Sequence, residues 1–173
     1  GRLSFQKGLD VLMDAMDSYG SNPGFHLAIA GKGQLSGWLE DRHARSNAKG
    51  NISVLGLVTD AEKRWMYENS DCVVIPSRFE GLPTVLLEAM HAGTPVVMAD
   101  VNGLGGLVGE CGSGLSVPCE DPESLALAMS RVMEADEDQA SAWKDSGKSA
   151  SRDYQWDRVT DRVLGVYRRV LGE

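Results

Sequence analysis

Short apolar runs alternate along the chain with longer segments in which apolar residues recur every three or four positions. Short apolar runs are typical of buried strands, and the longer period is typical of helices that bury one face. This alternation predicts an α/β fold, a Rossmann-like parallel sheet with helices on both faces. The predicted strands are 25–30, 52–55, 71–76, 95–99 and 115–117, and the predicted helices are 8–19, 34–47, one from about 60, 83–92 and one from about 122.

Residues with special backbone preferences mark where several of these elements begin and end. The run 20–23, Gly-Ser-Asn-Pro, is expected to end the first helix. Asp60 is expected to cap the helix that it begins. The helix 83–92 has Pro83 in its first turn and Gly93 just past its end, which is the preferred placement of these two residue types. The glycine-dense segment 102–109 is predicted to be a loop.

The closing segment carries an apolar stripe at spacings of three and four residues. Such a stripe predicts a helix that packs against a sheet or a neighbouring domain. The stripe consists of Trp156, Val159, Val163, Val166 and Val170.

Length and charge narrow the class of protein. The 173 residues fit one domain, so we expect a single domain over 1–173. The chain has 17 Lys and Arg against 25 Asp and Glu, and this net charge of -8 would repel the phosphate backbone of a nucleic acid. No apolar run approaches the roughly 18 residues that a membrane span needs. We therefore expect a soluble protein that has no transmembrane segment and does not bind nucleic acid.

The cysteines and histidines follow no pattern of a metal site. Three cysteines are an odd number, and no Cys-x-x-Cys or Cys/His ligand spacing occurs, so neither a disulfide framework nor zinc is indicated. The three histidines have no carboxylate or thiol partner in a recognisable motif, and we interpret them as structural or surface residues. We expect free thiols in a reducing cytoplasm at Cys72, which lies in an apolar run, Cys111 and Cys119.

The most informative stretch is 77–90, where a predicted strand ends and a helix begins. Ligands of open parallel sheets bind at this edge. The first turn of a helix has unpaired N–H groups and about half a positive charge, so Gly81, Leu82 and Thr84 are expected to offer backbone donors to a phosphate or a sugar oxygen.

Two carboxylates accompany these donors. Glu80 lies in the loop, and Glu88 lies in the helix with its side chain tilted towards the helix start. Because carboxylates accept hydrogen bonds, the two are expected to bind hydroxyl groups of a ribose and a hexose. Two alternatives stay open: a loop charge with a solvated helix face, and a glycosidase-like pair of acid and nucleophile.

These residues carry a resemblance to a known family. Glu80, seven residues, and then Glu88, within EGLPTVLLEAMHAGTPVV, resemble the E-x7-E signature of retaining glycosyltransferases of family 4, the glycogen-synthase-like glycosyl transferases group 1. The opening GRLSFQKG resembles the phosphate-binding segment of that family. The likeness extends through 27–33, 51–56 and 156–167, and so covers nearly the whole chain.

The resemblance implies the C-terminal, donor-binding domain of a two-domain GT-B fold, with the N-terminal acceptor domain absent. It implies that Arg2 and Lys7 bind the donor diphosphate, that Glu80 contacts sugar hydroxyls and that Glu88 holds the ribose. The expected catalytic residues are thus Glu80, Lys7 and Arg2. The expected donor-binding residues are Arg2, Lys7, Gly81, Leu82, Pro83, Thr84 and Glu88. Fixed cations and helix N–H groups stabilise a departing diphosphate, so no metal or cofactor is expected.

The implied reaction transfers a sugar with retention from a nucleoside diphosphate sugar, UDP-sugar first and GDP-sugar second, to an unknown acceptor. The isolated domain is expected to be inactive. The full-length enzyme is expected in the cytoplasm, with peripheral membrane association left open. Gly105 and Gly106 stand where the family has Pro and Glu, which leaves donor contacts from that loop open. A non-catalytic sugar-nucleotide-binding module and a GT-B nucleotide-sugar epimerase are the alternatives.

Overall fold

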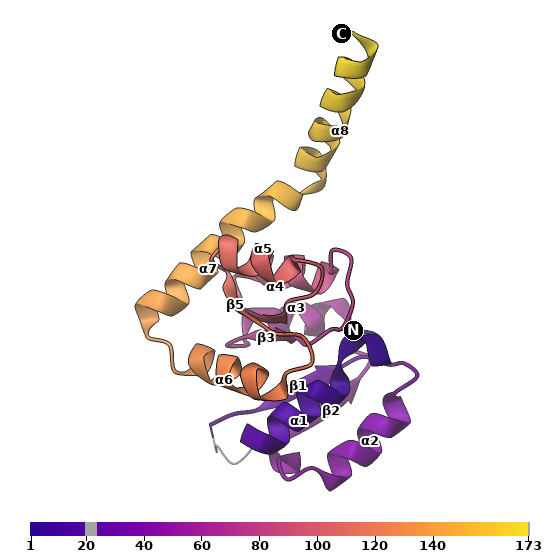
Figure 1. Ribbon diagram of the computed structural model, residues 1–173, viewed down its shortest axis with the longest axis vertical. Helices are drawn as coiled ribbons and strands as arrows, with labels where there is room; N and C mark the ends of the chain where they lie inside the picture. Colours follow the sequence, from indigo (N-terminus) through magenta and orange to yellow (C-terminus); the bar gives the residue numbers. More distant parts are fainter. Residues whose placement is uncertain (20–23, 173) are drawn as a thin grey trace.

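The computed structural model of the chain describes residues 1–19 and 24–172, and within them all strands are parallel (Figure 1). Two sheets form. One pairs β1 with β2, and the other has the order β3-β4-β5. The strands are β1 (Leu27–Ala30), β2 (Ile52–Gly56), β3 (Val73–Ile75), β4 (Val96–Ala99) and β5 (Gly114–Val117). The predicted α/β class and all five predicted strands are confirmed, although hydrogen bonding divides the strands between two sheets.

Helices join successive strands and extend the chain beyond the last one. The segment 5–7 forms a short 3-10 helix, η1 (Phe5–Lys7), and two further such turns are η2 (Lys49–Asn51) and η3 (Arg152–Tyr154). The α-helices are α1 (Leu9–Tyr19), α2 (Ser36–Arg45), α3 (Asp60–Glu68), α4 (Thr84–Ala92), α5 (Leu104–Glu110), α6 (Pro122–Met133), α7 (Glu137–Ser151) and α8 (Trp156–Leu171).

The buried strand β4 shows how helices cover both faces of the larger sheet. Val97 faces a core that includes buried side chains of α1 and α6. Its neighbours Val96 and Met98 face a second core with side chains of α4 and α5. Successive side chains of a strand point to opposite faces, so one strand contributes to two separate cores. The predicted covering of both faces is thereby confirmed.

The helix ends agree with the sequence prediction in part. Gly93 follows α4 in the left-handed conformation, with φ 82°, as expected for a glycine past a helix end. The prediction that Asp60 caps its helix is wrong. Thr59 is the cap, because its extended backbone lets its hydroxyl accept from the N–H of Glu62, whose carboxylate bonds back to the Thr59 N–H. The predicted stop at 20–23 lies outside the described residues.

The glycine-dense segment predicted to be a loop contains the helix α5. Asn102 and Gly103 lead into it with positive φ values, and the Gly105 N–H donates to the Asp100 carboxylate at 3.1 Å. A Cβ on Gly105 would lie 2.1 Å from the hydroxyl oxygen of Ser116 on β5. Close packing against the sheet therefore outweighs the low helix propensity of glycine.

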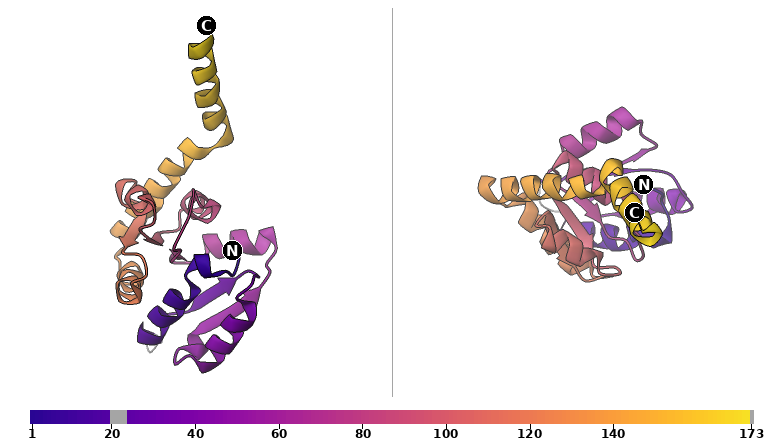
Figure 2. Two further views of the ribbon diagram at one scale, coloured as in Figure 1. Left: turned by 45° about the vertical axis from the view of Figure 1, so that its right-hand side comes forward. Right: turned by 90° about the horizontal axis from the view of Figure 1, so that it is seen from above.

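The last helix, α8, projects away from the rest of the chain (Figures 1 and 2). It contacts the preceding turn η3, and its stripe faces solvent, with Trp156 83% exposed. The expectation that this stripe packs on the sheet of the chain is wrong, because α7 carries α8 beyond the sheet. Packing on a neighbouring domain stays a prediction. No helix in the described ranges is long and apolar enough to cross a bilayer.

Candidate functional site

The candidate site is built where the loop 76–83, between β3 and α4, meets η1 near the start of the chain. Backbone and side-chain bonds join the two segments. The Arg78 N–H donates to the Gln6 carbonyl at 2.8 Å, and the Gln6 side-chain amide donates to the Phe79 carbonyl at 2.7 Å. The carboxyl end of β3 thus carries two segments that lie some 73 positions apart in the sequence.

Gly8 permits this close approach. Its φ is 62°, a left-handed backbone conformation that residues other than glycine rarely adopt. A Cβ at this position would lie 1.9 Å from the Pro76 carbonyl oxygen. The residue just before it, Lys7, is consequently held over the end of β3.

Lys7 and Glu80 meet directly. The Lys7 Nζ lies 2.5 Å from Glu80 Oε1, and the Ser77 hydroxyl donates to the same oxygen at 2.6 Å. Glu80 is 6% exposed, and its backbone carbonyl accepts from the Asn102 side-chain amide at 2.9 Å. Two donors therefore hold one carboxylate oxygen of Glu80, and the bond from Asn102 holds the backbone of the same residue. The sequence did not point to Ser77 or Asn102 as its partners.

Glu88 takes different partners, on α3. Lys63 Nζ donates to its Oε1 at 3.1 Å, and the Tyr67 hydroxyl donates to its Oε2 at 2.8 Å. Burial raises the pKa of Tyr67, and the bond to Glu88 raises it further. Lys63 and Tyr67 were not among the predicted site residues. Their spacing of four residues places them on one face of a helix, but only the packing of α3 on α4 turns that face towards Glu88.

The segment before η1 lies at the same edge of the strands. The Gly1 nitrogen donates to the Ala30 carbonyl at the end of β1, at 2.6 Å. The predicted residues Lys7, Glu80 and Glu88 thus lie around the carboxyl ends of the strands, although the two glutamates have separate partners.

Arg2 lies in an open hollow of about 600 Å³ whose lining residues do not include Lys7, Glu80 or Glu88. The hollow also has a second cation, Lys32, which was not among the predicted site residues. The Leu3 N–H donates to the Lys32 carbonyl at 3.1 Å, which holds the two walls together. The lining residues are Arg2, Ser4, Phe5, Gln6, Lys32, Gly33 and Gln34.

The start of α4 borders the Lys7–Glu80 pair. Pro83 is its N-cap residue and makes no side-chain capping bond, and Gly81, Leu82 and Thr84 are exposed. A Cβ on Gly81 would meet open space. This helix end can consequently offer N–H groups and its positive dipole end to an anion that bonds to Lys7. In the described ranges no three His, Cys, Asp or Glu side chains gather as a metal site.

Comparisons with known proteins show which family the sequence resembles. A profile of the family described as Glycosyl transferases group 1 matches residues 1–150. The chain is 33% identical over 168 residues to an uncharacterized glycosyltransferase of Methanocaldococcus jannaschii, covering 97% of this chain and 43% of that protein. It is 30% identical over 171 residues to glycogen synthase of Mycobacterium tuberculosis, covering 96% of this chain and 41% of that enzyme. The chain therefore spans less than half the length of these relatives.

Solved structures with the same fold include larger proteins and a single domain. Sucrose-phosphate synthase from Thermosynechococcus elongatus matches with a TM-score of 0.80 and 25% identity, over 99% of this chain and 44% of that one. Anabaena HepE, solved in complex with UDP, matches with a TM-score of 0.82 and 22% identity, over 98% and 47%. The C-terminal domain of a group 1 glycosyl transferase from Francisella tularensis matches at 0.76 and 18%, over 90% and 84%.

Proposed function

The chain belongs to the glycosyl transferases group 1 family, and on this premise we propose that it binds the diphosphate of a nucleoside diphosphate sugar. The observation that carries the proposal is the ion pair of Lys7 with the buried Glu80 at the uncapped start of α4. The UDP found with the fold relative HepE supports UDP-sugar as the first donor to test, and GDP-sugar is the second.

Lys7 is the proposed ligand of the phosphate. The Lys7 side chain is 30% exposed, so a second acceptor can approach the ammonium from solvent while Glu80 holds it from the protein side. The N–H groups at the start of α4 approach the same anion. Breaking a bond from sugar to phosphate leaves negative charge on the diphosphate, and these preorganised donors stabilise that charge as it develops.

The remaining site residues take complementary roles in the proposal. Arg2 bonds to the diphosphate from the hollow, with Lys32 as a second cation on its wall. Glu80 accepts a bond from a sugar hydroxyl, and Glu88 accepts bonds from the ribose hydroxyls after exchanging its contact with Lys63. Gly81, Leu82, Pro83 and Thr84 form the backbone side of the pocket.

The proposed reaction is transfer of the sugar with retained configuration, as in the retaining family 4 enzymes that the sequence resembles. An acceptor domain elsewhere in a longer polypeptide is part of this proposal, and it is supported by the 41–43% of each relative that the chain covers. No metal ion or cofactor is required, because Lys7, Arg2 and the helix start supply the positive charge.

Calorimetric titration of the chain with UDP, GDP and uridine tests the proposal. We expect one diphosphate nucleotide to bind and Lys7→Met to weaken it about tenfold or more, because a bond to a charged group is lost. Lys49→Met is the matched control, since Lys49 is an exposed lysine just before β2, at the opposite edge of the sheet. Binding of neither diphosphate, or equal losses in both variants, would overturn the assignment.

In the full-length enzyme the same residues should matter for turnover. Lys7→Ala and Glu80→Ala are each expected to reduce transfer by about 10²-fold or more, the effect of removing a group that stabilises the transition state. A non-catalytic binding module would show nucleotide binding without transfer, and this result would refute the catalytic part of the proposal alone.

A further inference from the structure

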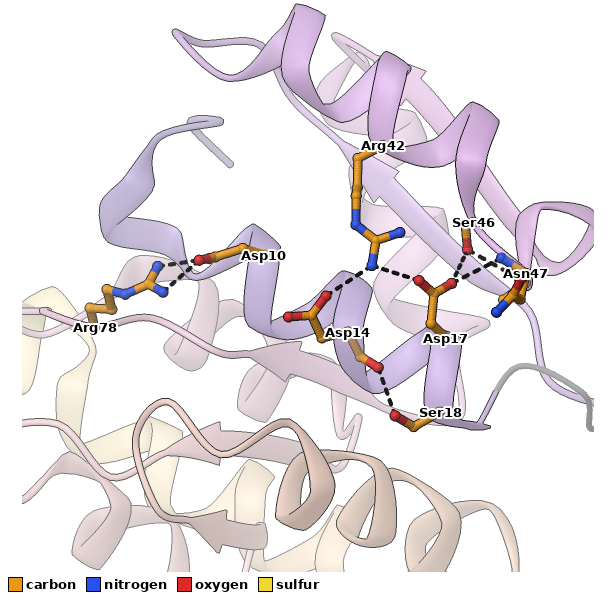
Figure 3. A network of polar contacts seen from close by, with 9 residues as sticks. Asp10, Asp14, Asp17, Ser18, Arg42, Ser46, Asn47 and Arg78 are labelled. Atoms are coloured by element: carbon orange, nitrogen blue, oxygen red, sulfur yellow. Dashed lines mark hydrogen bonds and ion pairs between the residues drawn. The ribbon is translucent and has the colours of Figure 1, made fainter.

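Arg78 joins three segments of the chain beside the candidate site. Its guanidinium bonds to both carboxylate oxygens of Asp10 on α1, at 2.8 and 2.7 Å (Figure 3). Its Nε lies 2.5 Å from Glu120, in the loop between β5 and α6. With a side chain 15% exposed, Arg78 is well covered, and bidentate pairing of this kind fixes direction as well as distance.

The same guanidinium also contacts η1. Its Nη1 donates to the Phe5 carbonyl at 2.9 Å, and its central carbon lies 4.0 Å from the centre of the Phe5 ring. Phe5 comes two positions before Lys7, and Asp10 comes three positions after it. Arg78 therefore grips the chain on both sides of Lys7.

The segment η1 itself buries no side chain, although Leu3 before it and Leu9 after it are buried. It is three residues long, none of them is buried, and the Phe5 side chain is 64% exposed. A single 3-10 turn is not stable by itself, and an exposed turn gains little from the hydrophobic effect. Between these buried neighbours, the turn itself is held by polar contacts with Arg78, Phe79 and Glu80 of the loop 76–80.

We propose that Arg78 is a positioning residue for the phosphate site: by holding Phe5 and Asp10 it sets the place of the Lys7 ammonium over Glu80. The inference rests on the proposed function, because it assumes that Lys7 bonds to the diphosphate. Arg78 itself does not bind the ligand in this scheme, since its single positive charge already faces the two carboxylates of Asp10 and Glu120.

The chain offers a matched control in Arg42 on α2. Its Nη2 lies 2.8 Å from Asp14 and 2.5 Å from Asp17, both on α1, and its side chain is 21% exposed (Figure 3). Arg42 thus also pairs with two carboxylates, although both of its partners lie on α1, whereas Arg78 has one partner on α1 and one in the loop before α6. The partners of Arg42 lie further along α1 than Asp10, away from η1.

The test measures binding of UDP and of uridine to the chain and its variants Arg78→Met and Arg42→Met, with urea denaturation of each. Arg78→Met should weaken UDP about tenfold and leave uridine unchanged, because a displaced Lys7 affects only the phosphate contact. Arg42→Met should lose a similar share of stability and keep the affinity for UDP. Arg78→Lys should restore UDP binding only in part, since a lysine cannot form the bidentate pair.

The outcomes separate the two proposals. If the unchanged chain binds neither UDP nor GDP, the proposed function fails. If it binds UDP, and Arg78→Met keeps the wild-type ratio of UDP to uridine affinity, the positioning role of Arg78 is refuted while the function stands. Should Arg78→Met fail to fold, Asp10→Asn weakens the same grip more mildly and is judged by the same ratio.

Discussion

Replacing the Lys7 ammonium while keeping a similar apolar stem, as in Lys7→Met, separates the structural role of the ion pair from its proposed binding role. In the unchanged chain Glu80 is 6% exposed, and the Ser77 hydroxyl donates to its carboxylate at 2.6 Å, a contact that the substitution does not remove. Removing one partner of a buried pair costs roughly 3–5 kcal/mol. Since the Lys7 side chain is 30% exposed and Ser77 remains, we expect a smaller loss of stability, about 2 kcal/mol.

The double variant Lys7→Met/Glu80→Gln sharpens the test. It removes the unpaired charge as well as the cation, and an amide can still accept from Ser77. We therefore expect the double variant to be about 1 kcal/mol more stable than Lys7→Met alone, because a neutral buried group costs less than an unpaired charge. Affinity for UDP should not return, since the ammonium that bonds to the phosphate is still missing.

Urea denaturation, monitored by circular dichroism, gives the stabilities, and calorimetry gives the affinities. Two results would refute the reasoning. Equal stability of Lys7→Met and the unchanged chain would mean that Glu80 does not depend on Lys7. Recovery of UDP affinity in the double variant would mean that the lysine acts only by neutralising Glu80.

Three further predictions follow from the local structure. Gly8→Ala should destabilise the chain by about 2 kcal/mol or more in urea, because its Cβ would meet a backbone carbonyl at 1.9 Å and φ is 62°, whereas Gly50→Ala, with open space around it, should stay within about 0.5 kcal/mol. Thr59→Ala should cost about 1 kcal/mol in the same assay through loss of the capping box, and no measurable change would contradict the cap. The bond from Arg78 holds the pKa of Asp10 below its usual range, so the stability of this pair is complete above about pH 3.9 and is lost as pH falls through the lower pKa of the folded state. Arg78→Met should therefore be less stable than the unchanged chain at neutral pH, and its stability should fall less steeply below about pH 4 when measured by circular dichroism. An identical acid profile would argue against the pair.

Local signals in the sequence were sufficient for most of the elements and for the loop that carries the site. The end of the helix α4 could be predicted, because Gly93 has a backbone preference that acts without tertiary context. Its start was predicted one residue early, since Pro83 is the extended N-cap residue and does not lie in the first turn. The place of Glu80, in a loop between a strand and a helix, followed from the same local pattern. Periodicity and residue chemistry decide such features within a window of a few residues.

Features that depend on packing were decided by the tertiary structure. The helix α5 forms despite its glycines because Gly105 lets it lie close to β5, and the stripe of α8 stays exposed because α7 carries it past the sheet. The pairing of the site residues was likewise decided by the tertiary structure. Lys7 and Glu80 are 73 positions apart, and only parallel strands that end at one edge bring such distant segments into hydrogen-bond range. The order of residues determines the local pattern of apolar and polar positions, whereas contacts across a sheet depend on the fold of the whole chain.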